Sequence, residues 1–508
     1  MLSKIYSFGL NGLNGYPVTL EADIQNGLPS CNIVGLADTA VKEAKERVRA
    51  ALKNSGYKYP LASIVINLAP ADTKKEGTVY DLAMALAVLI SSAQITAASS
   101  KEYIVLGELS LNGDVRYVSG LLPMLISAKQ QGYKKAVIPL ANRDEAKYID
   151  EVEIYAVSSL AETVDFLSGA KTLEKIETEK WSGNSSYNTD NGDIKYIKGQ
   201  YAAKRAMEIA VAGGHNILLI GPPGAGKTML ARAVPSIMPD LTFEEALEVA
   251  KIHSVAGTLD GGFVFSRPFR SPHHTATMVA LTGGGTKTHP GEISLAHNGV
   301  LFLDELPEYT RQTLEALRQP LEDGVITVSR AQGSVTYPAN FMLIASMNPC
   351  PCGNYGSETR PCTCSASQIH KYLSKLSGPL LDRIDIHIEV GSVTYGELSG
   401  NGESESSVTV RERVNKAREI QESRYIGSKT HCNSHMTSGE LKKYCKLDSK
   451  SSDLIEMSFE RLNLSARAYS RIIKVARTIA DLDGSEVIRP QDIAEAIQYR
   501  SLDRKYRV

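Results

Sequence analysis

Residues 216–229 read Asn216-Ile217-Leu218-Leu219-Ile220-Gly221-Pro222-Pro223-Gly224-Ala225-Gly226-Lys227-Thr228-Met229. In this segment an apolar strand runs into a glycine-rich loop, and a helical pattern follows to residue 234, which is the context that a phosphate-binding P-loop requires. Glycines let backbone N–H groups converge on phosphate oxygens, and the start of a helix adds its positive end there. Strands and helices alternate from residue 196 to residue 391, so we predict an α/β core with a parallel sheet and a nucleotide site.

The side chains of this loop suggest separate roles. Lys227 is expected to reach the β- and γ-phosphates of a bound triphosphate, and Thr228 is expected to ligate Mg²⁺. The residues expected to contact the nucleotide are Gly221, Pro222, Pro223, Gly224, Ala225, Gly226, Lys227, Thr228 and Met229. Upstream, residues 197–200 could border the adenine. The alternative is a glycine-rich turn without a ligand, which the flanking strand and helix disfavour.

Two later strands carry polar side chains at their ends. The apolar strand at residues 299–303 ends in Asp304 and Glu305, and ligands gather at the carboxyl ends of strands in open parallel sheets. Asp304 would hold Mg²⁺, while Glu305 would orient and polarise the attacking water. A third strand, residues 341–346, leads to Asn348, whose amide could hydrogen-bond the γ-phosphate or the water. The alternatives are a structural acidic pair and a turn asparagine.

The order of P-loop, Asp-Glu strand and Asn strand resembles that of AAA+ ATPases. Three segments more closely resemble the YifB/ComM family of magnesium-chelatase-like ATPases, namely residues 269–275, 290–299 and 317–324. The resemblance covers essentially the whole chain. It implies ATP hydrolysis with ATP and Mg²⁺ as cofactors, and assembly of the chain with itself into a homohexamer.

Two arginines resemble residues that act on the γ-phosphate in related proteins. Arg383 stands where MCM helicases carry an arginine finger, and a guanidinium supplied by a neighbour would make hydrolysis depend on assembly. A local ion pair with Asp382 or Asp385 is the alternative. Arg467 resembles the sensor-2 arginine, while Arg471, four residues on, lies on the same helical face and is the alternative candidate.

A β-hairpin is predicted at residues 325–337, where β-branched residues alternate around a glycine-bearing turn. It resembles the pre-sensor-1 hairpin of MCM helicases, and Arg330 falls where a basic residue projects into the ring's pore. A cation there could bind DNA phosphates without reading sequence, although a structural hairpin with a solvated arginine is the alternative. The adjacent His273 and His274 could bind a metal, but packing or ring contacts explain them equally well, so neither receives a catalytic role.

The leading function is therefore an ATP-driven translocase or helicase acting on single-stranded or branched DNA. The family resemblance implies branch migration in recombination or natural transformation. The alternative is a chelatase-like or chaperone-like motor that remodels a protein partner. A formal net charge of -1 means that any DNA contact must come from local patches. The chain shows no apolar run of membrane length and no secretory signal, which favours a cytoplasmic protein without a membrane partner.

Four of the seven cysteines crowd into fifteen residues, namely Cys350, Cys352, Cys362 and Cys364. Two thiol pairs on either side of a glycine-bearing loop could enclose a tetrahedral, structural Zn²⁺. The single-residue gap within each pair is tighter than in most zinc fingers. Free reduced thiols are the alternative.

Composition shifts divide the chain into three domains and two linkers. The predicted order is a Lon-protease-like α/β domain at 1–170, a linker at 171–195, the AAA+ core at 196–391, a second linker at 392–407 and a helical lid at 408–508. The Lon resemblance rests on residues 108–115 and 118–121. Lon chemistry needs a serine activated by a lysine, but Val79 and Leu122 stand at these places. Thr78 has no evident base, so we predict a platform without peptidase activity.

Overall fold

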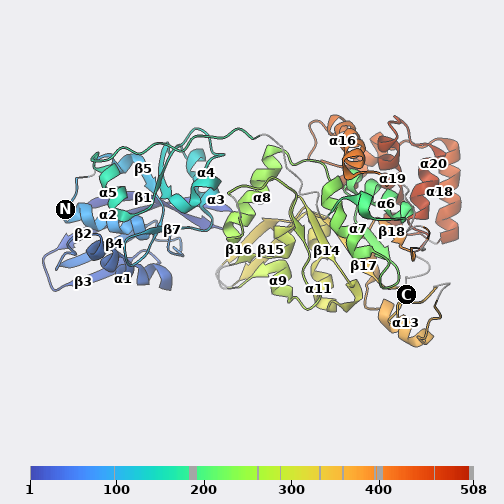
Figure 1. Cartoon of the computed structure of the whole chain (residues 1–508), viewed down its shortest axis with the longest axis horizontal. Helices are drawn as coiled ribbons and strands as arrows, with labels where there is room; N and C mark the ends of the chain where they lie inside the picture. Colours follow the sequence, from blue (N-terminus) through green and yellow to red (C-terminus); the bar gives the residue numbers. More distant parts are fainter. Residues whose placement is uncertain are drawn as a thin grey trace. The chain divides into compact units, whose positions relative to one another are not determined.

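The computed structural model describes residues 2–96, 98–181, 192–259, 262–285, 288–330, 333–356, 360–393, 396, 404–462 and 464–502. The chain forms two compact units (Figure 1). Unit 1 comprises Met1–Ser182 and Phe243–Val264, and unit 2 comprises Gly183–Thr242 and Phe265–Val508. Within the described ranges, no helix combines the length and the apolar character that crossing a membrane requires.

Unit 1 contains a seven-stranded mixed sheet with the order β3-β4-β2-β1-β5-β8-β9. Its strands are β1 (Ser3–Asn11), β2 (Asn14–Gln25), β3 (Ser30–Val34), β4 (Ser63–Ala69), β5 (Tyr103–Val105), β8 (Lys135–Pro139) and β9 (Glu153–Val157). The other elements of its first segment are α1 (Thr39–Asn54), α2 (Asp81–Ser91), α3 (Leu121–Gln130), α4 (Arg143–Ala146), α5 (Leu160–Leu167) and a short ladder of β6 (Glu108–Leu109) and β7 (Val115–Arg116). The mostly apolar α2 is buried along almost its whole length and forms the centre of this core.

Helix α8 (Phe243–Ala256) belongs to unit 1, although the chain on either side of residues 243–264 lies in unit 2. Ser254 helps to hold the helix there, because its hydroxyl donates to Glu145 Oε2 at 2.9 Å. The sequence places this segment within the predicted core at 196–391. Helical periodicity is the same whichever unit a helix packs against, so the pattern alone could not reveal that the chain enters unit 1 a second time.

Unit 2 contains an all-parallel sheet of five strands with the order β11-β14-β17-β10-β18. The strands are β10 (Ile217–Ile220), β11 (Phe269–Arg270), β14 (Val300–Leu303), β17 (Met342–Met347) and β18 (Ile386–Glu389). Every residue of β10, β14 and β17 is buried, as is typical of parallel strands that are covered on both faces. The predicted parallel sheet is confirmed.

The remaining elements of the core surround this sheet. They are α6 (Tyr201–Gly213), α7 (Lys227–Ala233), α9 (Met278–Thr282), α10 (Glu292–Leu295), α11 (Arg311–Ala316), α12 (Arg318–Asp323), α13 (Ala366–Leu373), α14 (Gly378–Leu381), the pair β12 (Gly283–Gly284) and β13 (His289–Pro290), and the hairpin β15 (Val325–Arg330) and β16 (Gly333–Pro338).

The C-terminal part of unit 2 is helical, as the sequence predicts. Its helices are α16 (Ser407–Arg424), α17 (Ser438–Tyr444), α18 (Ser449–Leu462), α19 (Ala466–Leu482) and α20 (Pro490–Gln498). Helix α19 begins after Ser465, whose hydroxyl accepts a hydrogen bond from the Ala468 N–H. Its apolar residues, among them Ile472 and Ile479, share one hydrophobic core with α6 and β10. These helices therefore pack directly on the α/β core.

A buried ion pair also connects the two parts of unit 2. Asp385, just before β18, is 4% exposed, pairs with Arg471 of α19 and lies 3.2 Å from His215 Nδ1. Burial alone would raise the pKa of Asp385, but the charge of Arg471 and the hydrogen bond with His215 outweigh it and lower this pKa well below its usual value. The carboxylate therefore stays ionised and fixes α19 against the strand.

Candidate nucleotide site

Three neighbouring strands deliver the predicted site residues to one edge of the sheet. The P-loop follows β10, Asp304 and Glu305 follow β14, and Asn348 follows β17, which lies between the other two strands. A cavity of about 380 Å³ opens at this edge, within the size range of ligand pockets. It is lined by Pro223, Gly224, Ala225, Gly226, Lys227, Thr228, Met229, Asp304, Glu305, Ser346, Met347 and Asn348.

The P-loop takes a shape that only glycine adopts easily. Gly224 has a φ of 77° and Gly226 a φ of 88°, both in the left-handed region. Lys227, which is 8% exposed, folds back so that its Nζ donates to the Gly221 carbonyl at 2.7 Å and the Pro222 carbonyl at 2.9 Å. Burial lowers the pKa of Lys227, while the charges of Asp304 and Glu305 oppose this shift. An incoming phosphate would offer this ammonium a charged partner in place of two carbonyls.

The residues predicted to hold Mg²⁺ are in contact. Thr228 Oγ1 donates to Asp304 Oδ2 at 2.9 Å, and the other oxygen of Asp304 accepts from the hydroxyl of Ser346. Mg²⁺ is usually bound by one or two carboxylates together with substrate phosphates. A hydroxyl and a carboxylate beside the phosphate loop therefore fit this ion. Ser346 holds Asp304 in place, and sequence reasoning missed it because strand periodicity does not show which side chains meet across a sheet.

Glu305 stands out from the sheet in an unusual backbone conformation. Its φ is 53°, in the left-handed region that non-glycine residues adopt at a cost of about 1–3 kcal/mol. Its side chain is 55% exposed, and its Oε2 lies 3.6 Å from His274 Nδ1. Sequence analysis assigned His274 no catalytic role, because packing or ring contacts explain the histidine pair equally well. Nothing in its own segment shows that it lies opposite Glu305. This arrangement leaves the Glu305 carboxylate accessible to a water at the cavity.

Asn348 is the third predicted contact to the γ-phosphate. Its Oδ1 accepts a hydrogen bond from Lys227 Nζ at 3.1 Å, so the amide and the ammonium face the same space. Both line the cavity together with Asp304 and Glu305. Residues 197–200 are not part of its lining, although the side chain of Gln200 donates to the Ala225 carbonyl at 3.2 Å.

The predicted arginines lie outside this cavity. Arg383 is 6% exposed and pairs with Glu322, not with Asp382 or Asp385. Arg467, on α19, is exposed, and its charge helps to lower the pKa of Glu322 after the larger effect of Arg383. The alternative sensor candidate, Arg471, is engaged by Asp385. Within one chain, Glu322 therefore pairs with Arg383 and is near enough to Arg467 for its charge to act on the carboxyl.

The β15–β16 hairpin is present, with antiparallel pairs from Val325–Pro338 to Arg330–Gly333. The side chain of Arg330 lies outside the described residues. In unit 1, Val79 and Leu122 are buried at 4% and 0% exposure, and Thr78 donates to Glu108. The absence of peptidase activity stays a prediction.

Comparisons with known protein families point to magnesium chelatase in each part of the chain. The family model described as magnesium chelatase, subunit ChlI, matches residues 193–398. The model for subunit ChlI of Mg-chelatase matches residues 20–142, and the ChlI C-terminal model matches residues 404–500.

Individual relatives extend this result. The uncharacterized protein YifB of Escherichia coli strain K12 and the competence protein ComM of Haemophilus influenzae are each 45% identical to the chain, over 99% of it and 98% of their own length. Lon protease 2 of Bacillus subtilis is 31% identical over 151 residues, which is 27% of each protein. This match supports the predicted likeness to Lon.

Proposed function

Because the chain belongs to the YifB/ComM family of magnesium-chelatase-like AAA+ proteins, we propose that it is an ATP-hydrolysing ring motor that moves DNA. One observation carries the ATPase proposal. Lys227 contacts Asn348 at 3.1 Å, and Thr228 contacts Asp304 at 2.9 Å, although these residues follow three separate strands in the sequence. Such convergence beside a glycine-rich loop suits a triphosphate with its metal.

The role of each residue in ATP hydrolysis follows from the charges on the phosphates and on the attacking water. The P-loop N–H groups and Lys227 would bind the phosphates, with Thr228 and Asp304 holding Mg²⁺, which neutralises charge on the β- and γ-oxygens when bound. Glu305 would position the attacking water and accept its proton, while Asn348 would orient the γ-phosphate without adding negative charge. The products are ADP and phosphate. His274 would hold Glu305 in place between turnovers.

A ring would complete the site through Arg383. In this proposal Arg383 leaves Glu322 at a subunit interface and reaches the γ-phosphate of the neighbouring chain, with Arg467 as the sensor of its own nucleotide. Glu322 is 55% exposed, so this partner can be given up without leaving a charge in the interior. Assembly and hydrolysis would then depend on each other.

Mixing two inactive variants tests the ring. Subunits with Arg383→Ala retain the P-loop, and subunits with Lys227→Ala retain the arginine. In a mixed ring, some interfaces combine Lys227 of one subunit with Arg383 of its neighbour. We therefore expect ATP turnover to reappear when the two variants are combined. Phosphate release, measured as a function of the ratio of the two subunits, would show it. Each variant alone is the control. If both assemble but no mixture hydrolyses ATP, Arg383 does not act across the interface.

Two observations support DNA as the substrate: the name of one relative, competence protein ComM, and the hairpin whose first strand ends at Arg330. Phosphate contacts are electrostatic and independent of sequence. Forked or single-stranded DNA should therefore stimulate ATP turnover, and this stimulation should weaken as salt rises. Branch migration in recombination or transformation is the process to which such a motor would contribute.

The hairpin gives this proposal a matched pair of variants. Arg330→Ala should reduce DNA-stimulated turnover and DNA affinity, each by roughly tenfold if one charged contact is lost. Arg330→Lys should keep most of both, because a phosphate accepts either cation. Turnover without DNA should be unchanged in both. If DNA neither binds nor stimulates the unmodified chain, the motor acts on a protein partner instead.

A further inference from the structure

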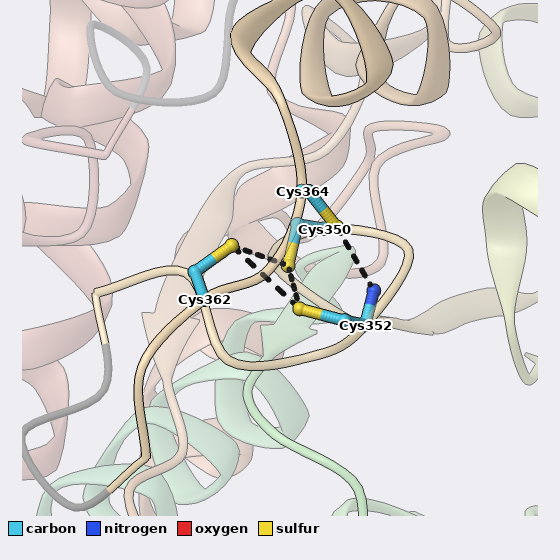
Figure 2. A group of neighbouring side chains, drawn as sticks. All are labelled: Cys350, Cys352, Cys362 and Cys364. Carbon is cyan, nitrogen blue, oxygen red and sulfur yellow. Dashed lines mark hydrogen bonds between the residues drawn. The ribbon is translucent and has the colours of Figure 1, made fainter.

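Four cysteine side chains lie close together in the segment that follows Asn348 (Figure 2). Cys350 and Cys352 follow β17, and Cys362 and Cys364 precede α13. Their four sulfur atoms all lie within 4.8 Å of one another. Cys350 is fully buried, and the other three cysteines are half-buried.

The sulfur separations fit ligation of a metal better than disulfide bonds. Cys350 Sγ lies 3.4 Å from Cys352 Sγ and 3.7 Å from Cys362 Sγ. The sulfurs of Cys352 and Cys362 are 3.6 Å apart. A disulfide requires about 2.05 Å. Four sulfurs around one zinc, each at about 2.3 Å, are about 3.8 Å apart along the edges of the tetrahedron. The cluster therefore already has nearly the size of a tetrathiolate site.

Backbone donors face these sulfurs as they do around bound thiolates. The Cys352 N–H donates to Cys364 Sγ at 3.4 Å, and the Tyr355 N–H donates to Cys350 Sγ at 3.3 Å. Helix α13 begins at Ala366, two residues after Cys364, with a full capping box at Ser365. Hydrogen bonds to ligand sulfurs stabilise their negative charge and hold their orientation. The cluster thus has both a set of four ligands and the polar contacts that support it.

We propose that Cys350, Cys352, Cys362 and Cys364 bind one Zn²⁺, and that this zinc site holds the Asn348 segment against the P-loop. Four thiolates in a tetrahedron select zinc, or iron, over hard cations. The segment between the sheet and α13 has little apolar material of its own, and metal binding would supply the free energy that orders it.

A close approach links the zinc site to the nucleotide site. Gly353 has a φ of 81°, and a Cβ atom there would lie 2.4 Å from Pro223 Cδ in the P-loop. Only glycine therefore allows the cysteine loop to pack on Pro223. Asn348 is two residues before Cys350 on the same loop. Loss of the metal would loosen both the amide that contacts Lys227 and the surface on which the P-loop rests.

The metal content of the chain is the first test, and it does not depend on the proposed function. The full chain, purified without chelator under reducing conditions, should hold about one zinc per chain by elemental analysis. A mercurial thiol reagent should release that zinc from the unmodified protein. The double variant Cys362→Ser/Cys364→Ser should lose it, whereas Cys31→Ser, a half-buried cysteine of unit 1, should keep it. Far less than one metal ion per chain would overturn the site, and one iron in place of zinc would overturn the choice of metal.

The link to the P-loop is the second test and rests on the proposed ATPase. Gly353→Ala keeps all four thiols, so it should retain zinc yet bind ATP at least about tenfold more weakly in fluorescence titrations, since its Cβ displaces Pro223. Unchanged ATP affinity in a zinc-loaded Gly353→Ala chain would overturn the link. If the unmodified chain holds zinc but neither binds nor hydrolyses ATP, the proposed function fails and the zinc site stands.

Discussion

Replacing Lys227 with alanine is expected to weaken ATP binding at least about a hundredfold and to abolish hydrolysis. Lys227 is 8% exposed, and its ammonium is held by two carbonyls and by Asn348 at the mouth of the phosphate loop. Hydrogen bonds to charged groups contribute about 1.5–3 kcal/mol each, so losing contacts to two phosphates should cost at least about 3 kcal/mol. That corresponds to a Kd about a hundredfold higher, which titration with a fluorescent ATP analogue would detect.

The matched control is Lys442→Ala, which removes an exposed lysine of α17 in the same unit. It should bind ATP as the unmodified chain does. Circular dichroism should show that both variants remain folded, because Lys227 is the first residue of α7, beside the phosphate loop, and is not part of the hydrophobic core. ATP affinity that survives in Lys227→Ala would mean that the triphosphate binds elsewhere.

Replacing Glu305 with glutamine should separate binding from hydrolysis. The amide has nearly the same shape as the carboxylate but cannot accept the proton of the attacking water. General-base catalysis contributes roughly 10²- to 10⁴-fold, so single-turnover hydrolysis should slow by that factor. ATP affinity should change little, because the Glu305 side chain is 55% exposed and lies 3.6 Å from His274, whereas the phosphates and Mg²⁺ would be held by Lys227, Thr228 and Asp304. The variant should therefore accumulate bound ATP.

Glu308→Gln is a close control for this prediction. Glu308 lies three residues later, is 44% exposed and pairs with Lys375, and it does not line the cavity. Its substitution should leave hydrolysis near the unmodified rate. A Glu305→Gln chain that hydrolyses ATP normally would remove Glu305 from the catalytic role and leave the water to another group.

The site residues that can be predicted from the sequence are those that lie within a few residues of the carboxyl end of a strand. Lys227, Thr228, Asp304 and Asn348 each follow an apolar run, and the ends of parallel strands meet at one edge of a sheet. Once three such runs are identified as parallel strands, the side chains that follow them are expected to be in contact. The helical C-terminal region follows in the same way from its apolar period, as α19 illustrates.

Contacts between segments without a shared pattern could not be predicted. His274 faces Glu305 from a separate loop. Arg383 pairs with Glu322 and donates to the Pro379 carbonyl, whereas the local ion pair considered from the sequence was with a neighbouring aspartate. Both results depend on side-chain direction and not on spacing. The placement of residues 243–264 in unit 1 depends on tertiary packing in the same sense.

The proposed motor requires a triphosphate at Lys227, with Mg²⁺ held between Thr228 and Asp304. A crystal or cryo-electron-microscopy structure of the Glu305→Gln chain with ATP and Mg²⁺ is the decisive experiment. We expect phosphate density along residues 221–228 and an ion in contact with both the Thr228 hydroxyl and the Asp304 carboxylate. Nucleotide bound away from this loop, or a metal ion without contact to Thr228 and Asp304, would show that the proposed site is wrong.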